Sequence, residues 1–369
     1  MKKYFFIVLC FFLFIYGCKK NEPLKIYSLF VGTYTENGSE GIYSYNFDSS
    51  TGELSNKILV APMGNPSFLK ISPNNKYLYA VEETNEYEGS SGGVVAFRID
   101  NNGALKEINA NSTIGAHPCH IGISEDGKFL AASSYSGGSL SIFKLGDKGE
   151  LLPNPQFVDH NLLDTTKTSH AHSAIFTKDG LFTADLGLDA VKRYTLLGDK
   201  FVPFKQFSID LPLKAGPRHF TFGQNGKFLY VINELNSTIT VFQRNTDNSY
   251  SELETQTTLA PEFKGESFCA DIHLSKDGKF LYGSNRGENT IVIFKVHQGN
   301  GKLGLVGRES VKGDWPRNFG IDPSDNYLLV ANQRSNNIIV FKRDMVKGTL
   351  NFLHEQELPS PVCLEFLEL

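Results

Sequence analysis

The stretch GPRHFTFGQNGKFLYVINELNSTITVF, residues 216–242, decides the fold. It contains three short runs in which apolar and polar residues alternate, separated by Gly, Asn or Glu-containing turns. Period-two alternation between turn-forming residues is typical of antiparallel β-strands joined by tight connections. The first run opens with Pro217, and the second follows Asn225-Gly226. We therefore predict three consecutive strands within this stretch.

The same pattern recurs along the chain. The second run, anchored at Lys227, has counterparts at successive steps of 46 to 53 residues, and the earliest copy begins at Tyr27. The other anchors are Lys76, Lys128, Leu181, Lys279 and Asn326. An alternating strand follows each anchor, and a Gly-x-Leu turn often follows that strand. Four short antiparallel strands per roughly 50 residues are the signature of a β-propeller blade, so the copies predict seven blades.

The two ends of the chain complete one another. The copy at Tyr27 lacks the proline-opened strand that precedes four of the other anchors, and residues 361–366 (PVCLEF) supply one with nothing after it. We therefore predict that N- and C-terminal strands close the last blade and leave no exposed sheet edge. An open solenoid would need capping repeats, and none is recognisable. The predicted fold is all-β, a seven-bladed β-propeller over residues 26–369.

The composition agrees with this architecture. The chain has 369 residues, of which 12% are aromatic, 34 are glycine and 3 are methionine, a balance that suits strands and turns. Its formal net charge of −4 gives no indication of a nucleic-acid partner. The sequence contains no P-loop, no dinucleotide fingerprint and no Cys/His spacing suited to zinc, so we expect no cofactor and no metal.

The first residues have the features of an export signal. Two lysines precede an apolar run over residues 4–16, which is too short for an ordinary transmembrane helix. Residues 14–18 (FIYGC) resemble a bacterial lipoprotein signal, in which the cysteine is acylated. We predict a signal peptide over residues 1–17, a lipid on Cys18 and a polar tether over residues 18–25. The protein would be exported and membrane-anchored, periplasmic or at the cell surface; a cleaved signal without a lipid is the alternative.

Register within the repeat brings varied polar residues to one end of the propeller. Positions nine and eight before each anchor, and six and seven after it, lie at the hairpin end away from its turn. These positions should ring one mouth of the central channel, which is a common place for a ligand. They include Cys119, His120, His172, Arg218, His219, Asp271, Arg317 and Asn318 before the anchors, and Glu83, Tyr135, Glu234 and Arg286 after them.

This mixture of side chains favours an anionic substrate. Arginines bind carboxylate or phosphate in bidentate fashion and can stabilise an oxyanion. Glu234 is placed to activate water, and His172 to exchange a proton as general base or acid. Glu234 could instead form a structural ion pair with Arg218, and each histidine could be a hydrogen-bonded interior residue. His170 and His172 share a strand face and could bind a metal, but the spacing places no carboxylate beside them.

Five short motifs carry a family resemblance: VGTYT (31–35), HAHS (170–173), DLGLD (185–189), GPRH (216–219) and NEL (233–235). With the proline-opened strands, they resemble the seven-bladed lactonase family, which includes propeller-type bacterial 6-phosphogluconolactonase and fungal carboxy-cis,cis-muconate cyclase. The resemblance covers nearly the whole chain after the tether. It implies a catalytic set of His172, Arg218, Glu234 and Arg286. As substrate-binding residues we expect His120, His170, His219, Asp271 and Arg317.

Three functions are compatible with these residues. The leading hypothesis is a hydrolase that opens a sugar lactone, similar to 6-phosphogluconolactonase, by activating water while arginines hold an anionic substrate. Export would separate the protein from cytoplasmic 6-phosphogluconolactone, so another sugar lactone is an open alternative. A muconate-type lactonising cycloisomerase would use the same arginines for two carboxylates. A non-catalytic exported propeller that binds glycan or protein would need an exposed aromatic patch rather than a basic pocket.

Overall fold

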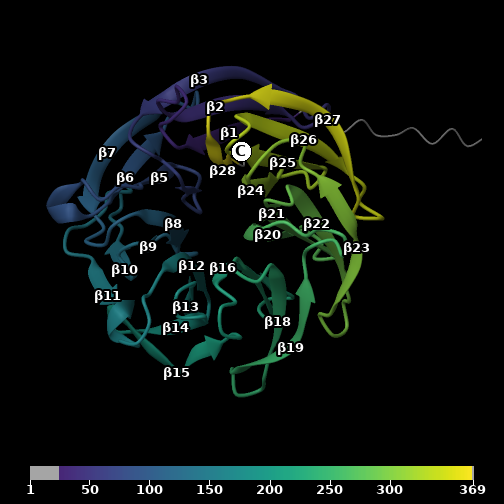
Figure 1. Cartoon of the computed structure of the whole chain (residues 1–369). Coiled ribbons are helices and arrows are strands. Elements are labelled where there is room, and N and C mark those ends of the chain that lie inside the picture. Colours follow the sequence, from purple (N-terminus) through teal and green to yellow (C-terminus); the bar gives the residue numbers. More distant parts are fainter. Residues whose placement is uncertain (1–24, 368–369) are drawn as a thin grey trace, which may run out of the picture.

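The computed structural model describes residues 25–367, which form 28 strands in seven four-stranded antiparallel sheets. The sheets stand around a central channel as the blades of a propeller (Figure 1). In each sheet the strand next to the channel is one of β4, β8, β12, β16, β20, β24 and β28, and neighbouring inner strands contact one another around the ring. The prediction of an all-β, seven-bladed propeller is therefore confirmed.

Two predictions concern residues outside this description. The signal peptide over 1–17 and the lipid on Cys18 lie outside the described residues, as does all of the tether except Lys25. The last two residues of the predicted domain, 368–369, also lie outside them.

The blades follow one another in chain order, and within each of the first six the chain runs from the inner to the outer strand. The first three are β4 (Leu69–Ile71), β5 (Tyr77–Glu82), β6 (Gly93–Ile99), β7 (Leu105–Ser112); β8 (Pro118–Ile123), β9 (Phe129–Ser134), β10 (Ser139–Lys144), β11 (Gln156–Asp159); and β12 (Ala171–Thr177), β13 (Gly180–Asp185), β14 (Ala190–Leu197), β15 (Lys200–Asp210). The next three are β16 (Pro217–Gly223), β17 (Phe228–Asn233), β18 (Thr238–Arg244), β19 (Tyr250–Thr257); β20 (Phe268–Leu274), β21 (Phe280–Arg286), β22 (Thr290–Val296), β23 (Leu303–Ser310); and β24 (Pro316–Ile321), β25 (Tyr327–Asn332), β26 (Asn337–Arg343), β27 (Leu350–Glu357).

The seventh blade contains both ends of the described chain. Its strands are β28 (Pro361–Leu367), β1 (Ile26–Thr33), β2 (Gly41–Asp48) and β3 (Leu54–Pro62). The C-terminal strand pairs antiparallel with the N-terminal one, with Val31 opposite Leu364. The predicted closure of the last blade by the two terminal strands is therefore confirmed, and the contact between β28 and β4 completes the ring.

The hydrophobic core lies between adjacent blades rather than at the channel. Tyr230 of β17 and Leu281 of β21, for example, belong to one buried cluster, although their strands are in different sheets. Alternation along each strand produces this arrangement, because each sheet is apolar on both faces and packs against a neighbour on each side. The inner strands are thereby held in place and carry polar residues into the channel.

A repeated contact fastens one blade to the next. The hydroxyl of Tyr230 donates a 3.0 Å hydrogen bond to the carbonyl of Gly301, in the Gly-x-Leu turn of the following blade. Gly301 has a φ of 72°, and a side chain there would meet the ring of Phe228. Glycine is therefore required both by the turn conformation and by the close approach of the aromatic ring. Equivalent bonds join Tyr79 to Gly149 and Tyr282 to Gly348.

The described residues contain little helix. Two short 3₁₀ helices are present, η1 (Glu88–Ser90) and η2 (His160–Leu162). Within residues 25–367, no helix has the length and apolar character needed to cross a lipid bilayer.

Candidate functional site

Irregular pairing of the inner strands shapes the channel wall. The register between β16 and β17 shifts between Pro217 and His219, so Arg218 is an extra residue. In a regular strand Arg218 and His219 would face opposite sides of the sheet, but a bulge can turn both side chains towards the channel. The same shift occurs at Pro118/His120, Ala171/Ser173, Cys269/Ile272 and Pro316/Asn318. The bulged residues therefore include Cys119, His172, Arg218 and Arg317.

Three of the four predicted catalytic residues are in direct contact. Oε2 of Glu234 lies 3.0 Å from Nε of Arg218 and 2.7 Å from Nη2 of Arg286. The contact with Arg218 is an ion pair without hydrogen-bond alignment. Both guanidinium groups are almost fully buried, whereas the Glu234 side chain is 16% exposed. Within residues 25–367, no hydrogen bond is donated to Oε1 of Glu234, so this oxygen can accept one from water or from a ligand.

Backbone carbonyls of strand β20 fix the two arginines. Nη1 of Arg218 donates to the carbonyl of Ala270. Arg286 donates from Nε to the carbonyl of Phe268 at 3.2 Å and from Nη2 to that of Cys269 at 3.1 Å. Burial lowers the pKa of Arg286 to about 10, which still leaves the guanidinium charged at neutral pH. The mouth therefore presents two oriented cations that share one carboxylate.

His172, the fourth predicted catalytic residue, lies at the same mouth without an ion-pair partner among the described residues. Its Nδ1 is 3.8 Å from Sγ of Cys119, and its ring packs edge-on against Tyr135 at 5.7 Å and His219 at 5.3 Å between centroids. Burial, assisted by the charge of Arg218, holds the pKa of His172 well below its ordinary value of 6.5. The ring is consequently neutral at pH 7 and can accept a proton.

Arg317 and a hydrogen-bonded group of Tyr34, Ser67 and Glu83 occupy the other side of the mouth. The Arg317 guanidinium lies over the ring of Tyr34, 5.2 Å from its centroid. The Tyr34 hydroxyl donates a 2.9 Å hydrogen bond to Glu83, and Ser67 donates to the same carboxylate oxygen. Within residues 25–367, no carboxylate lies within ion-pair distance of Arg317. Its guanidinium donors are therefore available to an anion.

Trp315 adjoins this mouth and was not among the predicted site residues. Its ring lies 5.2 Å from the Arg286 guanidinium and 3.4 Å from that of Arg334. Its φ of 68° is a left-handed conformation that is costly for a bulky side chain and is found mostly where surrounding structure imposes it. Tyr34, Glu83 and Tyr135 were also absent from the predicted catalytic and substrate-binding sets. The position seven residues after an anchor had placed Glu83 and Tyr135 at the mouth, and Tyr34 has the same position relative to Tyr27, a signal that could have identified it.

The predicted substrate-binding residues divide into two groups. Arg317 and His170 lie at the mouth, where His170 stacks on Tyr135 with 4.4 Å between ring centroids. His120, His219 and Asp271 lie one layer further along the channel and line a cavity of about 290 Å³. This cavity is also lined by Thr221 and His273, which are nearer to the Asp-Gly turns than the mouth residues are. We call the two ends of the propeller the mouth face and the turn face.

A buried network holds the segment that contains His170 and leads into strand β12, which carries His172. Asp185, at the end of β13, accepts hydrogen bonds from the backbone of His170 at 3.0 Å and from Leu188 at 3.0 Å. Its other oxygen contacts Nδ1 of His160 at 2.7 Å. Asp185 thus organises the DLGLD turn within its blade instead of lining the mouth. Across residues 25–367, no three His, Cys, Asp or Glu side chains come together as a metal site.

Comparisons with known proteins agree on one family. The family described as "Lactonase, 7-bladed beta-propeller" matches residues 28–366. A 6-phosphogluconolactonase of Formosa agariphila is 41% identical over 89% of this chain and 96% of its own length. One from Bacillus subtilis is 33% identical over 92% of this chain and 97% of its own length. The structure of a periplasmic gluconolactonase from Pseudomonas aeruginosa superposes with a TM-score of 0.86 and 32% identity, covering 93% of this chain and 99% of that protein.

Proposed function

Because the chain belongs to the family of seven-bladed β-propeller lactonases, we propose that it hydrolyses sugar lactones, with a preference for an anionic lactone such as 6-phosphogluconolactone. The observation that carries this proposal is the shared contact of Arg218 and Arg286 with Glu234, with the unpaired Arg317 at the same mouth. The two related 6-phosphogluconolactonases support the same reaction class.

In the proposed reaction, Glu234 transfers the proton and the arginines stabilise the negative charge. Glu234 accepts a proton from water through Oε1, and the water oxygen bonds to the lactone carbonyl carbon. The carbonyl electron pair moves to its oxygen, where Arg218 and Arg286 stabilise the oxyanion. Collapse breaks the bond to the ring oxygen, which takes the proton from Glu234 and leaves as a hydroxyl. His172, which has no ion-pair partner among the described residues, is the alternative base, although its lowered pKa makes it a weaker base than a solvent-exposed histidine.

The activity itself is tested by direct assay. Purified protein is expected to hydrolyse 6-phosphogluconolactone and glucono-δ-lactone faster than buffer does, measured by proton release in a weakly buffered solution. A rate equal to that of buffer across such a panel would exclude a lactonase. Loss of absorbance from a carboxymuconate, without lactone hydrolysis, would favour the cycloisomerase instead.

We expect Arg317 to select the charge of the substrate. Replacing it in Arg317→Gln removes an unpaired guanidinium, and charge-assisted hydrogen bonds contribute about 1.5–3 kcal/mol. KM for 6-phosphogluconolactone should therefore rise roughly 10- to 100-fold, while KM for uncharged glucono-δ-lactone changes little. The exposed turn-face variant Lys302→Gln changes the net charge equally and is the control. Equal increases in KM for both lactones would show that Arg317 does not distinguish a charged substrate from an uncharged one.

We also propose that the protein is exported and anchored through a lipid on Cys18. The short apolar run before this cysteine and the polar residues after it support the proposal. In a bacterial host that processes lipoproteins, the wild-type protein should incorporate an alkyne-labelled fatty acid, and Cys18→Ser should not. Lys20→Gln should retain the label. An unlabelled wild-type protein in the culture medium would point to a cleaved signal without a lipid.

A further inference from the structure

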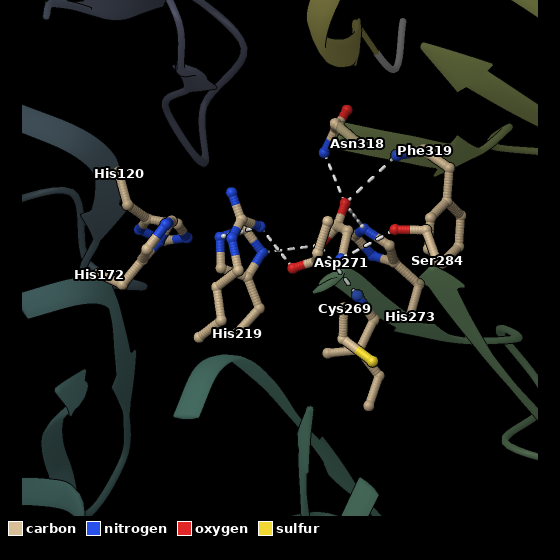
Figure 2. A network of polar contacts seen from close by, with 12 residues as sticks. His120, His172, His219, Cys269, Asp271, His273, Ser284, Asn318 and Phe319 are labelled. Atoms are coloured by element: carbon tan, nitrogen blue, oxygen red, sulfur yellow. Dashed lines mark hydrogen bonds and ion pairs between the residues drawn. The ribbon is translucent and has the colours of Figure 1, made fainter. Parts of the chain in front are cut away.

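A network of polar contacts lies in the channel below the mouth and includes His273, Asp271 and His219 (Figure 2). It begins at His273, continues through Asp271 and His219, and reaches Arg218 at the mouth. Nε2 of His273 lies 2.9 Å from one oxygen of Asp271, and Nδ1 of His219 lies 2.8 Å from the other. Nε2 of His219 is 3.5 Å from Nη1 of Arg218, which in turn meets Glu234. Arg218 and Glu234, which are proposed to be catalytic, are therefore connected through His219 to Asp271 and His273 deeper in the channel.

Asp271 has no capacity left for a substrate. Its carboxylate accepts hydrogen bonds from both histidines, from Nδ2 of Asn318 at 2.5 Å, and from the backbone of Ile272 at 2.9 Å and Phe319 at 3.3 Å. An ionised carboxylate offers about four acceptor sites, so these five donors saturate it. The side chain is also almost completely buried. Asp271 can therefore influence the reaction only through the groups that it holds, which differs from the substrate-binding role predicted for it.

The contacts determine which nitrogen of His219 carries a hydrogen. Because a carboxylate only accepts hydrogen bonds, the 2.8 Å contact requires a hydrogen on Nδ1. Burial, followed by the charge of Arg218, lowers the pKa of His219 to about 4, so its ring is neutral at pH 7. Nε2 then carries a lone pair, which is the arrangement that a neighbouring guanidinium N–H can approach. The other tautomer would set two N–H groups against each other.

We propose that Asp271 is a positioning residue, which through the tautomer of His219 orients the Arg218 guanidinium towards Glu234. Its effect on rate rests on the proposed lactonase function, whereas its effect on His219 does not. His219 and Asp271 lie one layer below the mouth. From there His219 contacts the Arg218 guanidinium, and Asp271 holds His219. His273 stabilises the outer oxygen of Asp271 from the cavity, where Lys70 and Glu365 form their own 2.8 Å ion pair.

The test is Asp271→Asn in the full-length protein, with Asp325→Asn as the matched control, because Asp325 is also a buried carboxylate but pairs with Arg343 at the turn face. Asparagine has a similar shape at this position, but its uncharged amide no longer fixes one tautomer of His219. We expect kcat to fall roughly 10- to 100-fold, as is typical when a group supporting an active-site residue is removed. KM for 6-phosphogluconolactone should change less than about threefold, because Arg317 remains. Asp325→Asn removes a buried carboxylate that contacts none of the mouth residues and should keep kcat within about twofold.

Nitrogen-15 NMR of the histidine rings provides a readout independent of activity. In the wild-type protein at pH 7, His219 should be the Nδ1–H tautomer, and Asp271→Asn should shift it towards a mixture. A wild-type ring with its hydrogen on Nε2 would overturn the proposal, and this measurement holds even if the variant fails to fold. Equal losses of kcat in Asp271→Asn and Asp325→Asn would also overturn it, since both would then act on the fold. A wild-type protein without lactonase activity would contradict the proposed function but not the tautomer.

Discussion

Replacing Glu234 by glutamine is expected to lower kcat for lactone hydrolysis about 10²- to 10⁴-fold, the usual contribution of a general base. The glutamine side chain has the same shape but cannot accept a proton from water. Arg218 and Arg286 keep their contacts with the carbonyls of β20, so binding of an anionic lactone should persist and KM should not rise. Steady-state kinetics on 6-phosphogluconolactone, corrected for the rate in buffer, measure the effect.

Two matched variants decide whether this loss is specific. Glu83→Gln removes a carboxylate from the same mouth, where it binds Tyr34 and Ser67 rather than the arginines, and it should keep kcat within about tenfold. His172→Asn tests the alternative base. If His172→Asn lowers kcat about 10²-fold or more while Glu234→Gln does not, the base is His172. A Glu234→Gln variant with wild-type kcat would remove the proposed role of Glu234 altogether.

Folding should be monitored alongside the kinetics. Two nearly buried guanidinium groups share the Glu234 carboxylate, and removing one partner of such a pair can be strongly destabilising. The melting temperature of Glu234→Gln should consequently fall, and activity must be compared well below it. If kcat is still lower at temperatures where the circular dichroism spectrum matches that of the wild type, the loss comes from the catalytic step and not from unfolding.

Deleting residues 361–369 is expected to abolish cooperative folding. The deletion removes β28, in which Val362, Cys363, Leu364 and Leu367 are at most 6% exposed. At roughly 1.5–3 kcal/mol for each buried apolar side chain, the lost burial is comparable with the roughly 5–15 kcal/mol that stabilises a typical domain. It also leaves β1 without its inner partner, as an unpaired edge prone to aggregation.

Urea unfolding and size-exclusion chromatography measure the outcome of this deletion. The truncated chain should show no sharp transition and should elute as aggregates. A synthetic peptide of residues 361–369 should restore a transition, because β28 joins its blade through hydrogen bonds and packing alone. A scrambled peptide is the control. A truncated chain with the wild-type urea midpoint would show that terminal closure contributes nothing to stability.

The repeat allowed the architecture to be predicted from the sequence. Each copy combines a turn, an apolar strand and an alternating strand, so the blade count and the pairing of β28 with β1 followed from periodicity. Counting from the anchors also brought Arg218, Glu234 and Arg286 to one mouth, and the structure places them in contact. Such register arguments succeed because the repeated hairpins of a radial array put equivalent positions at similar depth.

Periodicity alone did not predict the direction in which each side chain points. The bulge at Arg218 adds a residue that simple alternation does not contain, so the depth of His219 and Asp271 could not be derived. The saturation of the Asp271 carboxylate depends on β24, which is remote in sequence. Trp315 was visible in the sequence as the only tryptophan, but its place between Arg286 and Arg334 depends on three separate segments.

The direction of strand β1 has a consequence for how the protein can be held. Its first residue, Ile26, lies towards the turn face, and the strand ends beside Tyr34 at the mouth. The described chain therefore enters the blade at Lys25, on the side opposite the arginines. A support coupled at Lys25 would have the turn face as its near side. Arg218, Arg286 and Glu234 at the mouth would then face away from that support and stay accessible to a dissolved substrate.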